Sequence, residues 1–384
     1  MPDSVASSWF QRYLLPGFAF KAVVIGGGYA TGRELAEFFL PGGPWGGVKG
    51  MLLAMAVWSV VCMATFAYAH AAKTYDYRAF FRRLLGRGWG LFELAYLALL
   101  IVLLAVFGAA SGAIGAALFG WPPLLGTLCL AGGIALCVSF GNESVEQVFK
   151  WVSFFLYGVY ALFVVLALSR FGDRIALNFA APRAEASWAL NGLTYAGYNI
   201  IGAVVILPVA RHFIGRRDAL IAGAIAGLLA MLPALAFFVC MIAYYPQIAG
   251  QALPSDYLLQ RLDLPAFHSV FQLMIFAALL ESGSGAVHAI NQRVESVWRA
   301  RRDEDFPRRA RLIVAITLLV GSMFLADRFG LVDLIARGYR GLSYLLLAVY
   351  VAPLLTWGLW QLRRGRLSPA VAPEPIVILT GERT

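Results

Sequence analysis

Long apolar runs separated by short polar loops form the main pattern along this chain. Most runs reach roughly 18 residues or more, enough for a helix to cross a hydrocarbon core about 30 Å thick. The runs are continuous, whereas membrane strands would need only about ten residues of alternating polarity. The pattern predicts an all-α integral membrane protein with about ten transmembrane helices, at residues 13–40, 47–71, 88–119, 122–140, 143–170, 187–211, 217–244, 264–297, 309–326 and 329–361.

The amino-acid composition also indicates that the lipid bilayer surrounds the folded chain. Hydrophobic residues make up 60% of the chain and charged residues 14%, well below the roughly 25% charged residues of a soluble domain. The formal net charge of +10 does not indicate a nucleic-acid partner, because the arginines lie in short loops between apolar runs. We expect one transmembrane domain over residues 1–366 and a short flexible cytoplasmic tail over 367–384.

Arginine and lysine gather in alternate loops. The loops around residues 73–87, 211–217 and 293–311 are rich in these residues, and the loops between them are poorer. The positive-inside rule therefore places both termini in the cytoplasm, in a multi-pass protein of the bacterial cytoplasmic membrane.

Two helices carry stretches that weaken a helix near mid-membrane. The first contains Gly26, Gly27 and Gly28, and the sixth contains the glycine- and asparagine-bearing segment 191–199. The two stretches are five spans apart, an odd number, so a second half that repeats the first would be inverted in the membrane. We predict a 5+5 inverted repeat, about 13–170 and 187–361, with helices 1 and 6 discontinuous.

Unwound backbone in lipid leaves polar groups that need partners, and in transporters a cation or an anionic substrate group supplies them. The alternative is close packing of helices through small residues, as expected for Gly108 with Gly112. We favour a substrate site at mid-membrane, with the contacts Gly26, Gly27, Gly28, Thr31, Tyr195, Gly197, Tyr198, Asn199 and Glu281.

The eighth helix carries Glu281, Ser284 and His288 on one face. A carboxylate at that depth is a proton carrier if it is neutral and a cation ligand if it is charged, and serine hydroxyls suit Na⁺. A structural polar network is the alternative. Lys150 in the fifth helix either snorkels to the surface or replaces a sodium ion with its ammonium group.

Charges also flank the first break and the start of the tenth helix. Arg33 follows the glycines, and Asp333 begins the tenth helix at a similar depth. We predict that Arg33 and Asp333 form an outer gate. The alternative, which the sequence leaves equally open, is that Asp333 pairs with Arg337 four residues later.

The segment 23–39, VVIGGGYATGRELAEFF, resembles the first helix of the YkvI family of bacterial membrane proteins. That resemblance implies membership of the amino acid, polyamine and organocation transporter superfamily, and with it a leucine-transporter-type fold. It further implies a pocket among helices 1, 3, 6 and 8, with a cation between the carbonyls of Val24 and Ile25 and the hydroxyl of Ser282 or Ser284. Glu281 beside these serines leaves proton coupling open.

These features predict a secondary active transporter of a small polar organic solute, an amino acid or a related zwitterion or organocation, coupled to Na⁺ or H⁺. The partners expected are this solute and the lipid bilayer. No enzymatic arrangement is present in the sequence, and we expect no cofactor beyond the coupling ion. The alternative is a membrane sensor or scaffold that keeps the fold and binds a ligand without transporting it.

Overall fold

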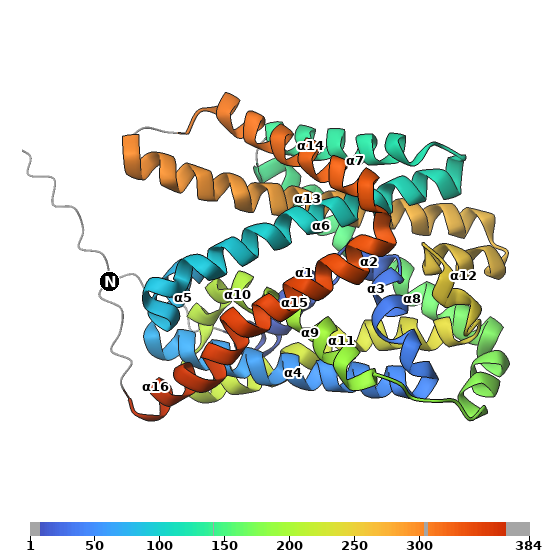
Figure 1. The fold of residues 1–384 in the computed structure, drawn as a ribbon, viewed down its shortest axis with the longest axis horizontal. Helices are drawn as coiled ribbons and strands as arrows, with labels where there is room; N and C mark the ends of the chain where they lie inside the picture. Colours follow the sequence, from blue (N-terminus) through green and yellow to red (C-terminus); the bar gives the residue numbers. More distant parts are fainter. Residues whose placement is uncertain (1–7, 141, 303–305, 366–384) are drawn as a thin grey trace, which may run out of the picture.

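Helices build the part of the chain that the structure describes (Figure 1). The computed structural model describes residues 8–140, 142–302 and 306–365, and within them the backbone alone at 27–28, 140, 142–154, 300–301 and 308. The predicted tail, 367–384, lies outside the described residues. The helices are α1 (Leu15–Val24), α2 (Gly27–Ala30), α3 (Arg33–Phe38), α4 (Gly43–Ala72), α5 (Tyr77–Leu85), α6 (Trp89–Phe119), α7 (Pro123–Phe140), α8 (Asn142–Ala180), α9 (Trp188–Asn199), α10 (Gly202–Val205), α11 (Arg216–Ile242), α12 (Pro254–Leu262), α13 (Pro265–Arg302), α14 (Arg308–Asp333), α15 (Arg340–Leu346) and α16 (Leu359–Arg363), with short 3₁₀ or π segments η1 (Phe10–Leu14), η2 (Leu40–Gly42), η3 (Gly86–Gly88), η4 (Leu207–His212), η5 (Gln247–Gly250), η6 (Leu334–Tyr339), η7 (Leu347–Val351) and η8 (Leu354–Gly358).

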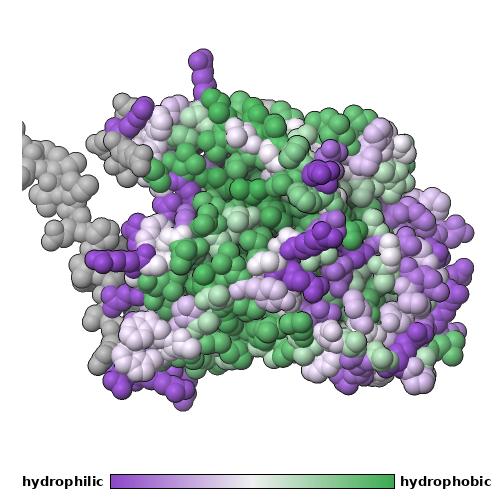
Figure 2. All heavy atoms as spheres, viewed as in Figure 1, coloured by the Kyte–Doolittle hydropathy of each residue, from purple (hydrophilic) through white to green (hydrophobic). Residues whose placement is uncertain are grey.

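Six helical stretches among the described residues are long and apolar enough to span a membrane: Arg33–Ala72, Tyr77–Phe119, Phe155–Ala180, Arg216–Ile242, Pro265–Arg299 and Arg309–Arg363. The last bends at Gly330, whose φ is 69°, and α1, α2, α7, α9 and α10 add shorter pieces outside these stretches. Figure 2 shows a broad apolar belt between two polar ends. The predicted all-α membrane fold is confirmed. The order of its segments is consistent with ten spans, and the inverted repeat stays a prediction.

Small residues let neighbouring helices approach closely. A Cβ added at Gly223 of α11 would lie 2.4 Å from the backbone nitrogen of Met63 in α4, and one at Gly227 would lie 2.3 Å from Ser59 Oγ. In the same way, a Cβ added at Gly112 of α6 would lie 2.6 Å from the carbonyl oxygen of Pro123 in α7. Packing of backbone against backbone through glycine, typical of membrane helices, fixes the frame around the broken helices.

The pattern of long apolar runs does not predict the short loop helices α5 and α12. The carboxylate of Asp76 caps α5 by accepting the N–H of Ala79 at 2.9 Å. Phe80 and Phe81 are buried on one face of α5, while Arg82 and Arg83 are exposed. A short amphipathic helix of this kind lies along the bundle instead of crossing the membrane, so span length does not reveal it.

Candidate functional site

The first helix is broken where the glycine triplet predicts. Helix α1 ends at Val24, and Ile25 leaves helical geometry with φ −75° and ψ 74°. The N–H of Gly26 then donates to the carbonyl of Val24 at 2.8 Å, where a continuous α-helix would use the carbonyl four residues back. A second break follows at Gly32, whose φ is 78°, before α3 begins. The first helix is therefore three short helices, α1, α2 and α3, joined by bent backbone.

The sixth helix is also broken, but outside the predicted stretch. Helix α9 continues through segment 191–199, and the break lies at Ile200 and Ile201, before α10 begins. The glycines of that stretch serve packing, since a Cβ at Gly192 would lie 2.5 Å from the carbonyl of Gly50, and one at Gly197 would lie 2.1 Å from Ser343 Oγ. The discontinuity of helices 1 and 6 is confirmed, and the position of the second break is corrected.

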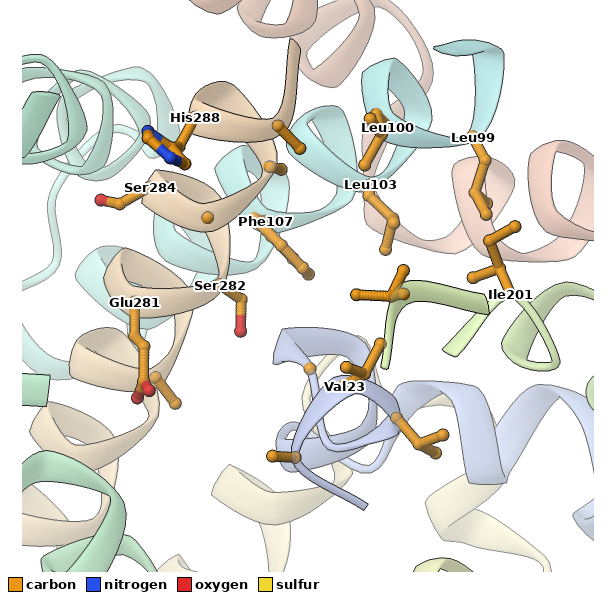
Figure 3. A pocket seen from close by; sticks show the side chains of 18 of the residues that line it. Val23, Leu99, Leu100, Leu103, Phe107, Ile201, Glu281, Ser282, Ser284 and His288 are labelled. Atoms are coloured by element: carbon orange, nitrogen blue, oxygen red, sulfur yellow. The ribbon is translucent and has the colours of Figure 1, made fainter. Parts of the chain in front are cut away.

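Both breaks face one cavity of about 740 Å³. Its walls come mainly from α1, α6 and α13, with residues of α3, α7, α8, α9, α10 and α14, and Figure 3 shows side chains converging on a common space. Leu99, Leu103 and Phe107 of α6 form an apolar wall, opposite α13. The cavity follows α13 to Glu295 and Arg311, toward the end where Figure 1 places α5 and α16. We call this the open end.

Several predicted site residues line this cavity: Gly26, Tyr198, Asn199 and Glu281 of the substrate set, and Val24, Ile25, Ser282, Ser284 and Glu281 of the coupling set. At Gly27 and Gly28 the structure describes the backbone alone, as the start of α2. Lys150 belongs to α8, and its side chain lies outside the described residues.

Three predicted substrate contacts lie elsewhere. Thr31 is buried, and its carbonyl accepts the N–H of Ser255 at 3.0 Å. Tyr195 is buried with its ring 4.8 Å from that of Phe39, and Gly197 packs on α15. Thr31, Tyr195 and Gly197 are thus part of the packed frame and not of the cavity wall, which corrects the prediction.

The two serines of α13 point in different directions. Figure 3 shows Ser282 projecting toward α1 on the side of Val23, whereas Ser284 and His288 leave the helix on its other side. The imidazole Nε2 of His288 lies 2.9 Å from the amide Nε2 of Gln292. Of the two predicted hydroxyls, that of Ser282 faces the broken first helix.

Glu34 is a cavity residue that the predicted site did not include. It lies in the first turn of α3, is only 4% exposed, and accepts a 2.6 Å hydrogen bond from the hydroxyl of Tyr198. This bond joins the outer half of the first helix to the sixth. A charge two residues beyond a glycine break at membrane depth was the signal that could have identified it.

The predicted gate between Arg33 and Asp333 is wrong for this structure. Arg33 Nη2 donates to Glu37 Oε2 at 2.7 Å, and its Nη1 donates to the carbonyls of Ala249 and Gln251 at 2.9 and 3.0 Å. Asp333 instead pairs with Arg337 at 3.7 Å on the exposed surface, the alternative expected from their four-residue spacing.

The tenth helix still meets the first at this end, through Arg340. Its Nη2 lies 3.8 Å from Glu37 Oε1, so Glu37 holds Arg33 and Arg340 together. With the carbonyls of Ala249 and Gln251 these three residues form a cluster that we call the outer cluster. It covers the break of the first helix at the end opposite the open one, which we call the closed end.

Comparison with known proteins shows which proteins this chain resembles. No family model matches the chain. Over 337 residues, 86% of this chain and 92% of the relative, it is 22% identical to the uncharacterized membrane protein YkvI of Bacillus subtilis. This confirms the resemblance that the first-helix motif carries.

Solved structures extend the comparison to the fold. MhsT in complex with L-phenylalanine is similar with a TM-score of 0.61 at 16% identity, over 94% of this chain and 96% of that one. The chain has the leucine-transporter-type fold. A Na⁺-coupled sialic acid symporter shares this fold with a TM-score of 0.61 at 14% identity, over 88% and 78% of the two chains. A manganese transporter of Eremococcus coleocola shares it with a TM-score of 0.53 at 15% identity, over 92% and 81%.

Proposed function

We propose that the chain is a secondary active transporter that moves a small polar organic solute, an amino acid or a related zwitterion or organocation, by alternating access. The observation that carries this proposal is a cavity that reaches both broken helices from one end while the outer cluster covers the other. Solute sites at the midplane between broken helices are the rule in carriers built this way. Two structural relatives named as a manganese transporter and a Na⁺-coupled symporter support it, and so does MhsT, which holds L-phenylalanine.

Both termini lie in the cytoplasm in this proposal, because the arginine-rich loops share their side. The open end then faces the cytoplasm, and the structure corresponds to an inward-facing state. Alternating access requires a second state in which the outer cluster separates and the cavity closes around α13.

The coupling ion in this proposal is Na⁺ or H⁺, and two side chains of α13 separate these cases. Ser282 faces Val23 and the freed backbone of the first helix, where carbonyl and hydroxyl oxygens suit Na⁺. Glu281 lines the same cavity and suits a proton. Ser282→Ala is expected to abolish stimulation by a sodium gradient, and Glu281→Gln to abolish stimulation by a proton gradient, with Ser284→Ala as the matched control.

Uptake into proteoliposomes tests the proposal. Purified protein is reconstituted and given radiolabelled amino acids and amines, with sodium or proton gradients imposed separately. Gradient-dependent accumulation of at least one solute is expected. Binding of a solute by the purified protein without flux under either gradient would instead favour the sensor or scaffold.

A further inference from the structure

The cavity presents a carboxylate at the point where the two broken helices meet. Glu34 of α3 and Tyr198 of α9 both line it, and the tyrosine hydroxyl donates to Glu34 Oε2 at 2.6 Å. Tyr198 is fixed from behind, because its ring stacks on that of Tyr339 at 4.4 Å. The carboxylate is therefore held in place before any solute arrives.

No basic side chain neutralises Glu34 in the described part of the chain. Its neighbour Arg33 points away, to Glu37 and the loop carbonyls. Arg311 lines the cavity at its rim and is already bound to Glu295 at 3.0 Å. A carboxylate that is 4% exposed loses most of its hydration, and one hydroxyl and the N-terminal end of α3 compensate only part of that loss.

The cavity that Glu34 lines suits an organic cation better than a metal ion. The ring of Phe107 lies beside the first break, since a Cβ at Gly26 would come within 3.5 Å of it. Aromatic faces attract ammonium groups, and the leucine wall of α6 suits an apolar body. No group of three or more metal-ligating side chains occurs among the described residues.

We propose that Glu34 binds a protonated amine of the transported solute, with Tyr198 orienting the carboxylate, so that the substrates are amines or amino acids with an apolar body and not net anions. This inference rests on the proposed function only in taking the cavity as the solute site. The Na⁺-coupled sialic acid symporter has the same fold but is named for an acidic solute, which is the opposite of the solute proposed here.

Binding to the purified protein tests this inference without transport. Matched probes share one apolar body and end in an amine, an alcohol or a carboxylate: 2-phenylethylamine, 2-phenylethanol and 3-phenylpropanoate, with the isopentyl set alongside. Affinity is measured by tryptophan fluorescence in amine-free phosphate buffer, with Na⁺ or K⁺ as the salt. We expect the amines to bind at least about tenfold more tightly than the alcohols, and the carboxylates more weakly still.

Substitutions test whether amine binding depends on Glu34 itself or on the net negative charge of the protein. Glu34→Gln is expected to weaken amine binding at least about tenfold and to leave alcohol binding unchanged, whereas Tyr198→Phe weakens amine binding about threefold. Glu185→Gln, which removes the same charge from an exposed pair with Lys49, should bind as the unaltered protein does. Elution volume and circular dichroism show whether each variant is folded.

Three results would overturn the inference. They are a protein that binds none of the amines, equal affinity for amines and carboxylates, and unchanged amine affinity in folded Glu34→Gln. If that variant keeps amine affinity but loses a proton-gradient effect on uptake, Glu34 carries a proton instead. Absence of flux with Glu34-dependent amine binding would refute the transporter and leave this site standing.

Discussion

Two carboxylates at opposite ends of the cavity each hold a pair of arginines. At the closed end, Glu37 binds Arg33 at 2.7 Å and Arg340 at 3.8 Å. At the open end, Glu295 binds Arg299 at 2.8 Å and Arg311 at 3.0 Å. The two carboxylates are equally exposed, at 18% each, but the arginine side chains are 6% and 36% exposed at the closed end and 56% and 43% at the open one.

The difference shows what makes an ion cluster a barrier. At the closed end a buried guanidinium also donates to the loop carbonyls of Ala249 and Gln251, so the loop between α11 and α12 is tied to the first helix. At the open end the arginines face water, where ion pairs contribute little. The same residue types therefore hold one end together and merely border the other.

Removing the buried guanidinium should have the largest effect. Arg33→Ala leaves Glu37 and two loop carbonyls without their donor, and loss of one partner of a buried pair costs about 3 to 5 kcal/mol. We expect a large fall in the thermal unfolding midpoint of the purified protein. Arg311→Ala, the matched change at the open end, should cost about 0 to 1 kcal/mol. Equal losses in the two variants would contradict the distinction between the ends.

The turn beneath the outer cluster gives the next largest effect. Gly32 has φ 78°, and a Cβ there would lie 2.5 Å from Phe237 Cε1. Gly32→Ala combines backbone strain with overpacking, about 2 to 4 kcal/mol together. Gly120→Ala is the control, because Gly120 lies in the same left-handed region, with φ 66° and ψ 19°, and no atom lies within 4 Å of the added Cβ, so strain alone remains, about 1 kcal/mol. Unfolding measurements that rank the two variants equally would show that Phe237 moves aside without cost.

Gly32 also explains how far the sequence predicted the site. The glycine triplet marked the first break correctly, because three adjacent glycines weaken any helix. Beyond the break, the left-handed turn at Gly32 resets the helical phase. Glu34 consequently faces the cavity while Thr31 faces the packed frame, and no periodicity counted along the segment anticipates this change.

The sixth helix shows that glycines in a sequence do not by themselves locate a helix break. Gly192 and Gly197 lie where another backbone or side chain approaches closely, and the break follows at Ile200 and Ile201. A glycine that permits unwinding and one that permits close packing look alike in a sequence, because both lack a Cβ. The partner helix decides between the two roles, and the sequence does not specify that contact locally. The long spans were predictable because the bilayer alone sets their length.

The smallest effect is expected at Asp333, which tests whether the closed end depends on Arg33 and its cluster alone. Asp333 is 48% exposed and its partner Arg337 is 83% exposed, so water already screens the pair. Asp333→Asn should change the free energy of unfolding by less than about 0.5 kcal/mol and leave proteoliposome uptake unaltered. A marked loss of uptake in a folded Asp333→Asn protein would mean that Asp333 meets Arg33 in a second, outward-facing state. The outer cluster would then be one arrangement of a gate whose arginine exchanges partners during transport.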